Sequence, residues 1–336
     1  MSGYLIEFEA SRRLREFRQA SCRGVERAFE QVNDPASVKQ TVIISVNPRS
    51  GSGRGGNAVK LAAERMRAGG LEVLQSTEIE EVIQEVNRLL PGGRLRAVVA
   101  AGGDGTVGLL ANRLPPQTPL AILPLGTENL LAKFLKIQPG GASTADLVLA
   151  NQTAWLDAGQ ANGRLFLIMA SIGFDAEVVH RMHRARTGNI SRSSYFWPIW
   201  EAISKYRYPR LQVSVDGVAL DPPPTWAFVF NVPRYAMNLQ IVPEAKANDG
   251  LLDLRTFRKG NLFHGLKYFG SVVLRLHRML QEAAYRQGRK IEIDSDEPVP
   301  IQLDGDPAGS TPVTIEVIPR RLRLLAPADF FTSSVS

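Results

Sequence analysis

Ala101–Thr106 (AGGDGT) directly follows the apolar run Leu95–Ala100 (LRAVVA), and this junction determines the fold class. The run predicts a buried strand that ends in a turn with three glycines, one carboxylate and one hydroxyl. Glycines let the backbone approach a bulky anion closely, and their N–H groups can point at phosphate oxygens. The apolar segment Val107–Leu114 predicts a helix whose N-terminus adds a positive dipole end. Taken alone, this stretch is equally typical of an ordinary turn between a strand and a helix.

The carboxylate of Asp104 is the unusual group in this turn. An aspartate that faces phosphate repels it unless a cation lies between them. Asp104 therefore indicates either a Mg²⁺ ion at the phosphates or a residue that accepts a proton during the reaction.

Two other loops repeat the pattern. Asn47–Gly53 (NPRSGSG) follows the strand-like run Thr41–Val46, and Pro124–Asn129 (PLGTEN) follows Leu120–Leu123. Strands that are apolar throughout are typical of a parallel sheet covered on both faces. Ligands of such sheets bind at the carboxyl ends of the strands. Three glycine-containing loops at one edge therefore predict a nucleotide site.

The two halves of the chain differ in their pattern of predicted strands and helices. From Thr41 to Trp155, strands alternate with helical patterns, which predicts a doubly wound α/β domain. After Trp155, short strand-like runs such as Trp226–Asn231 and Lys290–Ile293 follow one another with turn signals between them. This density predicts an antiparallel, β-sandwich-like second domain.

Six short motifs along the chain carry a resemblance to a known family. They are NPRSG at 47–51, GGDGT at 102–106, PLGTEN at 124–129, SIGFDA at 171–176, PEA at 243–245 with NDGLLD at 248–253, and QLDGD at 302–306. With these motifs in this order, the chain resembles the diacylglycerol kinase catalytic family, which includes sphingosine and ceramide kinases and bacterial lipid kinases. The resemblance covers about Thr41 to Ala326.

The resemblance implies a two-domain kinase that binds ATP in its cleft and phosphorylates a lipid hydroxyl. It implies a nucleotide-binding domain at 41–155, to which residues 315–336 return, and a β-rich lipid-substrate domain at 156–314. Residues 1–40 precede both as a predicted helical extension. By motif, the ATP site comprises Asn47, Pro48, Arg49, Ser50, Gly51, Thr77, Gly102, Gly103, Asp104, Gly105, Thr106, Gly126, Thr127 and Asn129.

The resemblance also implies catalytic and metal roles. Asp304 is expected to accept the proton of the lipid hydroxyl, helped by Asp306 or Asp104. Mg²⁺ is expected to bridge the phosphates of ATP. A structural Mg²⁺ is expected to bind the Asp249 carboxylate and the carbonyl oxygens of Lys246 and Leu251.

Several positions depart from the family's pattern. Gly108-Leu109 stands where Asn-Glu is common, and Leu130 replaces a carboxylate. Asp306 is one methylene shorter than the usual Glu, where side-chain reach sets the geometry of proton transfer. These departures leave the acceptor and the metal geometry open. Two rival functions also remain: an NAD-kinase-like enzyme with a soluble dinucleotide acceptor, and a non-catalytic nucleotide- or lipid-binding relative.

The composition excludes several classes. A chain of 336 residues, 44% hydrophobic and 22% charged, is typical of a soluble globular protein, and we expect it in the cytoplasm. The single cysteine, Cys22, excludes an internal disulfide framework, and with only four histidines a zinc site is not expected. No run approaches the roughly 20 apolar residues of a membrane span, and the N-terminus does not resemble a signal peptide.

Two segments combine basic and aromatic residues. Residues 180–210 hold seven Arg or Lys against one acid, and residues 255–290 hold nine against one. Such mixtures suit an anionic membrane surface, single-stranded nucleic acid, or amphipathic helices with solvated basic faces. A lipid acceptor favours the membrane, so we expect peripheral contact with an anionic membrane surface and no nucleic-acid partner. Residues 1–40 are expected to pack on the body or on a second subunit, as in a homodimer.

Overall fold

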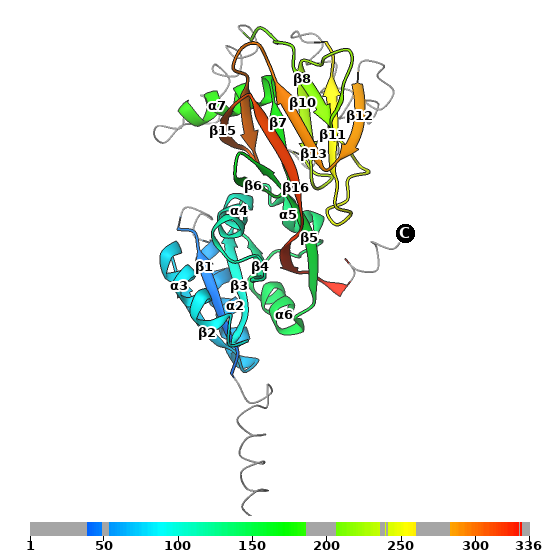
Figure 1. Ribbon diagram of the computed structural model, residues 1–336. Coiled ribbons are helices and arrows are strands. Elements are labelled where there is room, and N and C mark those ends of the chain that lie inside the picture. The colour runs from blue at the N-terminus through cyan, green and yellow to red at the C-terminus, as the bar shows by residue number, and fades with distance from the viewer. Residues whose placement is uncertain are drawn as a thin grey trace, which may run out of the picture.

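The computed structural model describes residues 39–48, 54–185, 206–235, 239, 241–259, 283–328 and 330. These residues form two large sheets, and long strands connect the two halves of the molecule (Figure 1). The predicted N-terminal helices and most of the two basic and aromatic segments lie outside the described residues. None of the described helices is long and apolar enough to cross a membrane.

The first half is built on a parallel sheet in the order β2-β1-β3-β4, which β16 continues. The strands are β1 (Thr41–Val46), β2 (Glu72–Ser76), β3 (Leu95–Gly102), β4 (Pro119–Pro124) and β16 (Val313–Leu325). Every neighbouring pair in this row is parallel. All but one residue in each of β1, β3 and β4 are buried, as expected for strands covered on both faces.

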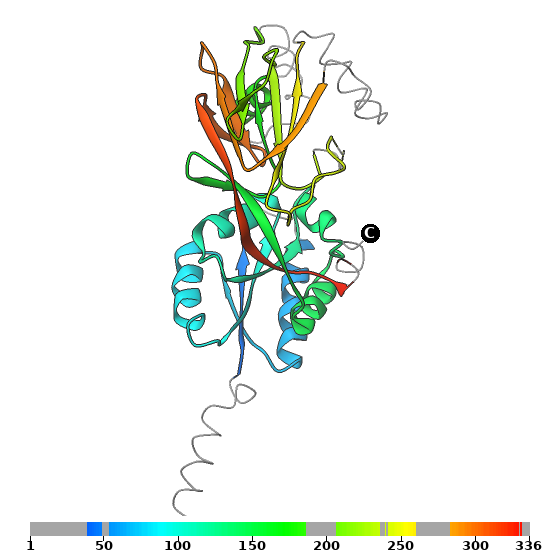
Figure 2. The same cartoon turned by 45° about the vertical axis from the view of Figure 1, so that its right-hand side comes forward.

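Helices cover both faces of this sheet (Figure 2). They are α2 (Arg54–Ala68), α3 (Ile79–Leu89), α4 (Asp104–Arg113), α5 (Leu130–Phe134) and α6 (Gly141–Ala150). In α3, the buried Val82, Val86 and Leu89 recur at helical spacing and face the sheet. Between α2 and α6 the approach is so close that a Cβ on Gly141 would lie 2.1 Å from the Ala58 carbonyl oxygen. The predicted doubly wound arrangement is therefore present.

The second half is a sandwich of antiparallel strands. One layer is the far end of the first sheet, in the order β16-β13-β8-β9, with β5 and β6 beside β16, and the other is a six-stranded sheet in the order β12-β11-β10-β7-β14-β15. The first layer contains β5 (Thr153–Ala161), β6 (Arg164–Phe166), β8 (Gln212–Val215), β9 (Val218–Ala219) and β13 (Lys290–Asp294). The second contains β7 (Met169–Ile172), β10 (Trp226–Phe230), β11 (Leu252–Phe257), β12 (Ala283–Gly288), β14 (Pro300–Leu303) and β15 (Asp306–Ser310). Helix α7 (Phe174–Ala185) follows β7 and packs on β14 and β15.

Two apolar cores hold these layers. One fills the sandwich and includes Leu254 and Ile301 from one layer and Ile291 and Ile315 from the other, all at most 1% exposed. The larger core runs from the first half into the base of the second and includes Ile122, Met169 and Phe230. The shared core explains why the two halves contact each other directly. The predicted fold class, an α/β nucleotide-binding domain with an antiparallel β-sandwich-like domain, is confirmed.

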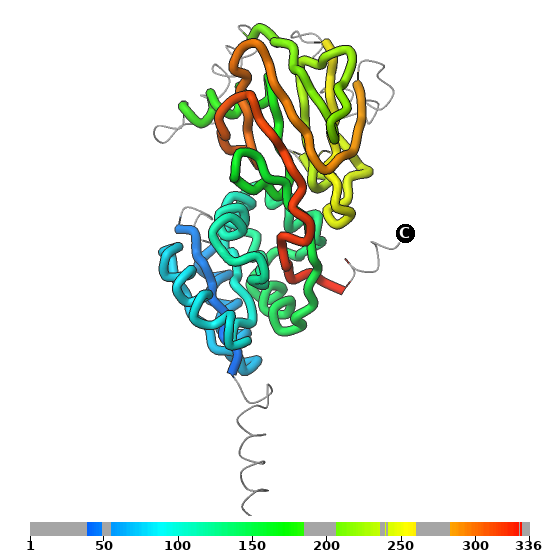
Figure 3. The backbone as a smooth tube through the Cα atoms, viewed as in Figure 1, coloured from blue at the N-terminus to red at the C-terminus, as the bar shows by residue number. Residues whose placement is uncertain are grey.

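Strands β5 and β16 run through both halves side by side (Figure 3). At its start β16 pairs with β13, and at Arg323 and Leu324 it pairs with β4 of the first sheet. Between these regions the register shifts, and Arg320 has a positive φ of 50°. The chain therefore does return to the first sheet. The exact boundaries at residues 155 and 315 stay a prediction, because both connecting strands belong to both halves.

Candidate active site

The three predicted phosphate loops meet at the carboxyl edge of the first sheet. Asn47 Nδ2, after β1, donates a hydrogen bond of 3.0 Å to Thr106 Oγ1, after β3. The Leu125 amide, after β4, donates to the Gly102 carbonyl oxygen at 3.0 Å. These bonds place the three strand ends beside one another, as the sequence predicted. Arg49, Ser50 and Gly51 lie outside the described residues.

Two glycines permit this close approach. A Cβ on Gly102 would lie 2.2 Å from Thr106 Oγ1, and a Cβ on Gly126 would lie 2.6 Å from the Gly103 Cα atom. Because the second contact is with backbone, no side-chain movement could relieve it. The glycines of GGDGT and PLGTEN therefore hold two loops together as well as leaving room for an anion.

Asp104, the first residue of α4, has a structural role that the sequence did not reveal. Its carboxylate accepts hydrogen bonds from the amides of Leu130 and Leu131, at 2.9 and 3.1 Å, at the start of α5. Burial raises the pKa of Asp104, although the two amides and Lys133 oppose the shift. Asn129, at φ 49°, closes the same loop through two hydrogen bonds to the backbone of Gly126. Asp104 thus links two of the three loops.

A cavity of about 670 Å³ opens beside this edge, between α2 and the ends of β1 and β2. Val46, Gly56, Val59 and the predicted residue Thr77 are among its lining. Its size is in the range of ordinary small-molecule sites. Pro48, Gly105 and Thr127 are exposed at the same edge of the sheet.

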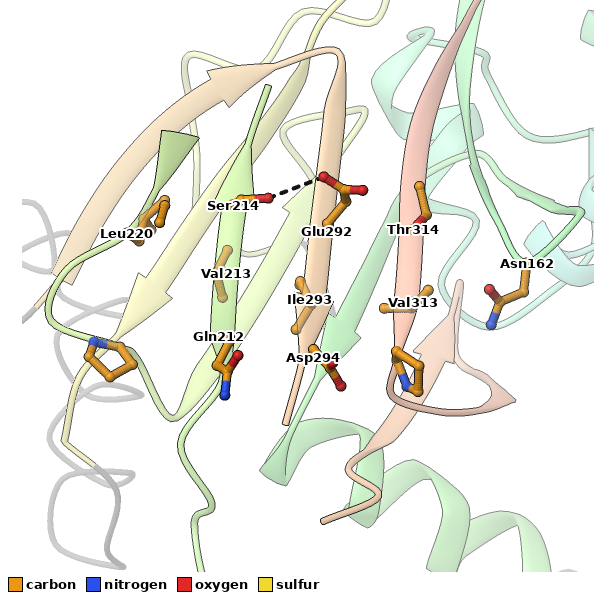
Figure 4. Close-up of a pocket in the computed structure, with 13 residues that line it drawn as sticks. Asn162, Gln212, Val213, Ser214, Leu220, Glu292, Ile293, Asp294, Val313 and Thr314 are labelled. Carbon is orange, nitrogen blue, oxygen red and sulfur yellow. Dashed lines mark hydrogen bonds between the residues drawn. The ribbon is translucent and has the colours of Figure 1, made fainter. Parts of the chain in front are cut away.

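A cavity of about 710 Å³ lies elsewhere, on the outer face of β8, β13 and β16 (Figure 4). Its lining mixes apolar side chains with polar ones such as Ser214 and Glu292, which form a hydrogen bond of 3.3 Å. None of the predicted site residues lines it. The candidate site is therefore the edge where the glycine loops meet.

The Asp304–Asp306 segment is a tight hairpin between β14 and β15. Leu303 pairs with Asp306, and both intervening residues have positive φ, 51° at Asp304 and 91° at Gly305. This is the geometry of a type I′ turn, for which Asp-Gly is a preferred sequence. The turn directs the side chains of Asp304 and Asp306 into different environments.

The Asp304 side chain is held by backbone amides. Its carboxylate accepts hydrogen bonds from the amides of Leu167, Ile168 and Met169, at 2.7, 2.9 and 2.9 Å. Burial raises the pKa of Asp304 to about 6 even though these amides favour the charged form, and the Asp104 carboxylate adds to the rise. The two carboxylates come from different halves of the molecule, and Asp104 is near enough to contribute to this rise.

Asp306 is accessible by contrast. Its side chain is 48% exposed and forms an ion pair with Arg164 Nη2 at 3.1 Å. Arg164 also donates to the Pro307 carbonyl oxygen at 3.2 Å, so one arginine holds the start of β15. Asp306 therefore retains free lone pairs that Asp304 lacks.

Comparisons with known proteins agree with this arrangement. Residues 41–161 match the diacylglycerol kinase catalytic domain, and residues 168–326 match the YegS C-terminal NAD kinase beta sandwich-like domain. The first half of the chain thus matches the diacylglycerol kinase catalytic domain, the family that the motifs predicted. A diacylglycerol kinase of Bacillus subtilis is 24% identical over 69% of this chain and 78% of its own length. An uncharacterized protein of Synechocystis is 25% identical over 76% of this chain, and the match spans only 60% of that protein.

A solved structure shows the same fold. A putative diacylglycerol kinase from Bacillus anthracis superposes with a TM-score of 0.69 at 21% identity, over 89% of this chain and 99% of the other. The matched kinase domain and the relatives named diacylglycerol kinase support a phosphotransferase activity.

The predicted metal turn lies against the connecting strands. The Leu251 amide donates to Asp249 Oδ1 at 3.0 Å, and the Gly250 amide donates to Asp157 Oδ2 at 2.7 Å. The other oxygen of Asp157 accepts from the Arg320 amide at 2.7 Å, where β16 changes register. Asp157, 1% exposed, thus ties the turn to the junction. The sequence signal for this role is an aspartate in the middle of the largely apolar strand β5.

Asn112 is a second residue that the motifs did not identify. From the last turn of α4 it bonds both backbone groups of Leu165 in β6, at 2.9 and 3.2 Å. The neighbouring Arg164 in β6 is the residue that pairs with Asp306. One side chain thus connects the helix that begins at GGDGT to the strand that restrains Asp306.

Proposed function

We propose that this protein transfers the γ-phosphate of ATP to a hydroxyl group of a lipid. The observation that carries the proposal is the junction itself. There the glycine loops of a parallel sheet lie near the Asp304–Asp306 turn of a second sheet. Asn112, in the helix that begins at GGDGT, bonds the backbone of Leu165, and the adjacent Arg164 pairs with Asp306. Phosphoryl transfer needs this combination, because its main demands are a cradle for phosphate oxygens and a group that orients the nucleophile.

The nucleotide is assigned to the edge of the first sheet. We infer that the base occupies the cavity beside Thr77, and that the phosphates lie over Gly102–Thr106 and Asn47. The amides at the start of α4 then face the phosphates with the positive end of the helix dipole. Held in place before the reaction, these amides can stabilise the charge on the transferred group.

The oxygen ligands of this chain fit Mg²⁺, which prefers carboxylate and carbonyl oxygens. Asp249 supplies one exposed carboxylate for the turn at 246–251, and the carbonyls of Lys246 and Leu251 supply the other oxygens. No cluster of three or more His, Cys, Asp or Glu occurs within the described ranges. A small carboxylate set that leaves room for water and phosphate is typical of Mg²⁺ sites. When bound at the phosphates, Mg²⁺ neutralises charge that develops during transfer.

The proton acceptor that the geometry favours is Asp306. A general base needs a free lone pair within hydrogen-bond reach of the hydroxyl. Asp306 is half exposed at the junction, whereas all three hydrogen bonds of the Asp304 carboxylate go to buried backbone amides. We therefore assign proton transfer to Asp306 and the shape of the turn to Asp304. Arg164 keeps the Asp306 side chain oriented through its ion pair.

The lipid acceptor is proposed from the relatives. The Bacillus subtilis and Bacillus anthracis proteins bear the name diacylglycerol kinase. Peripheral binding to an anionic membrane, a cytoplasmic location, a homodimer and the lack of a nucleic-acid partner stay predictions from the sequence. A lipid substrate is consistent with the two basic and aromatic segments, because Trp, Tyr and basic side chains favour the headgroup layer.

An acceptor panel tests this function. The purified protein is incubated with radiolabelled ATP and Mg²⁺ against dispersions of diacylglycerol, a sphingoid base, ceramide and phosphatidylglycerol, and against soluble NAD. Products are identified by mass spectrometry, and a parallel series contains a chelator. We expect label in one lipid and none in the chelated samples. Label in NAD alone would identify a dinucleotide kinase, and binding of ATP without label in any acceptor would identify a non-catalytic relative.

A further inference from the structure

Asp175, near the start of α7, belongs to a buried polar cluster that the proposed chemistry does not use. Its carboxylate accepts hydrogen bonds from the hydroxyls of Ser171 and Tyr235 and, at 3.2 Å, from Gln302 Nε2. Among the described residues, no arginine, lysine or histidine forms an ion pair with Asp175. Burial and the adjacent carboxylate raise the pKa of Tyr235, so its phenol remains a donor. Three neutral donors therefore hold this carboxylate.

Gln302, in β14, extends the cluster to the candidate active site. Its side chain is 2% exposed, and Nε2 also lies 3.0 Å from Ser171 Oγ. On the other side of the amide, Oε1 accepts a hydrogen bond of 2.7 Å from the amide of Gly305. Gly305 is the second residue of the type I′ turn and directly precedes Asp306.

The orientation of the Gln302 amide follows from Asp175. A carboxylate can only accept hydrogen bonds, so the NH₂ group of Gln302 must face it. The carbonyl oxygen then faces the opposite way, toward the Gly305 amide. Reversing the side chain would place oxygen against carboxylate and NH₂ against N–H, leaving both contacts unpaired in a buried site.

We propose that Asp175 is a positioning residue, which acts through Gln302 to fix Gly305 and with it the carboxylate of Asp306. The three amides of residues 167–169 hold the turn at Asp304. The Gln302 bond holds it at Gly305, on the side that leads to Asp306. The effect on turnover rests on the proposed function, whereas the link from Asp175 to Gly305 does not.

The expected effect is on turnover rather than on nucleotide binding. A misplacement of about 1 Å at a reacting group can cost about 100-fold in rate. Losing one of two restraints on the turn is expected to lower kcat by about 10- to 100-fold. The KM for ATP should stay within about twofold, because the phosphate loops belong to the other sheet.

Three variants separate orientation from simple packing. Asp175→Asn introduces an NH₂ group that lets Gln302 reverse. Gln302→Glu places two carboxylates against each other at neutral pH. When the introduced glutamate is protonated, it can again donate to Asp175 and accept from Gly305. The double variant Asp175→Asn/Gln302→Glu exchanges donor and acceptor, so the introduced amide faces the introduced carboxylate. That carboxylate can still accept from Gly305, and the link is restored.

The matched control is Gln287→Glu in β12. Gln287 donates to the largely buried Asp253 at 3.0 Å in the same sheet, so the substitution creates the same pair of carboxylates away from the turn. Besides Asp175, the titratable groups nearest the Gln302 pair are Tyr235, His180, which bonds the Ile301 carbonyl oxygen, and Asp304. These groups are common to all variants, so differences between them report the Gln302 pair.

The decisive readout is hydrogen exchange at the Gly305 amide, measured by NMR on protein labelled with ¹⁵N-glycine, together with kcat and the KM for ATP. Both single variants should exchange at Gly305 at least about tenfold faster than the wild type. The double variant should recover protection and kcat, and Gln302→Glu should recover both toward pH 5. Gln287→Glu should change neither quantity.

Unchanged Gly305 exchange in both single variants would overturn the link, whatever the activity. Faster exchange with unchanged kcat would overturn the positioning role. A wild-type protein that phosphorylates no acceptor would instead overturn the proposed function, and the exchange rates would still decide the link. If Asp175→Asn does not fold, the protection of the Gly305 amide in Gln302→Glu relative to the wild type, compared at pH 5 and at pH 7, makes the same test.

Discussion

The Asp304→Asn substitution tests whether burial raises the pKa of Asp304, in the turn at residues 304–306. Asparagine keeps the shape of the side chain and removes its charge. It also tolerates the left-handed backbone, and Asn-Gly is as well suited to a type I′ turn as Asp-Gly. The backbone of the turn, with φ of 51° and 91°, should therefore be retained. Asparagine also leaves at least one of the three backbone amides without an acceptor, a loss that does not vary with pH. The pH dependence of the difference between the two proteins therefore reports the protonation of Asp304.

The contribution of Asp304 to the free energy of unfolding follows from its pKa. Burial raises the pKa of Asp304 from 3.8 to about 6, so the folded state binds the proton more tightly than the unfolded state. The resulting stabilisation is fully present below about pH 4 and is lost as the pH rises through about 6. Linkage between these two values gives a free energy of unfolding about 1 kcal/mol larger at pH 5 than at pH 7 from this group alone.

Urea unfolding of the wild type and of Asp304→Asn at pH 5, 6 and 7 measures this contribution. Other titrating groups are common to both proteins, so their difference in unfolding free energy reports Asp304. Relative to the variant, the wild type should gain about 1 kcal/mol between pH 7 and pH 5. The exposed Asp296→Asn serves as the control and should show no such trend. A difference that is constant with pH, or that falls on acidification, would show that the three amides outweigh burial, and the reasoning would be wrong.

Three further outcomes are expected. Gly126→Ala places a Cβ against the backbone of Gly103, so it should lower the melting temperature by several degrees and weaken ATP binding in a nucleotide titration. The control is Gly108→Ala, whose Cβ meets nothing within 4 Å and which should affect the melting temperature little. Asp104→Asn should reduce kcat by about 10²–10⁴-fold in the radiolabel assay, and its circular dichroism spectrum should stay that of the folded protein. Near-normal turnover would remove Asp104 from the mechanism. Replacing Arg184, Arg186 and Arg192 of the first basic segment with Gln should weaken binding to anionic vesicles without changing activity on a short-chain soluble lipid. Equal loss of activity on vesicles and on the soluble lipid would point to a catalytic or folding role for these arginines.

The strands of the first sheet could be predicted because their sequence depends on burial alone. Thr41–Val46 and Leu95–Gly102 are mostly apolar, and each leads into a glycine loop. Their shared edge follows from the parallel arrangement, so the meeting of the loops was predictable as well. By contrast, β16 spans both sheets through a shift of register near Arg320, and no periodicity in the sequence marks such a change of partner.

The roles of the carboxylates were harder to predict, because each depends on contacts between distant segments. Asp304 was expected to accept a proton, but its surroundings are amides more than 130 positions earlier in the chain. Asp104 was assigned only to phosphate chemistry, yet it also holds the start of α5. The link from Asp175 to Gly305 exists only because β7 pairs with β14, and that pairing brings Ser171 beside Gln302. A motif fixes residue types and spacing, and the packing decides which atoms remain free.

The phosphotransfer rate of Asp306→Asn tests the central claim most directly. The variant removes the accessible carboxylate at the junction and leaves the buried Asp304 in place, and Asp296→Asn is the matched control. With the lipid that the wild type phosphorylates, the account predicts that kcat falls by about 10²–10⁴-fold in Asp306→Asn and is unchanged in Asp296→Asn, with ATP affinity retained in both. An Asp306→Asn protein that phosphorylates the lipid at the wild-type rate would contradict it.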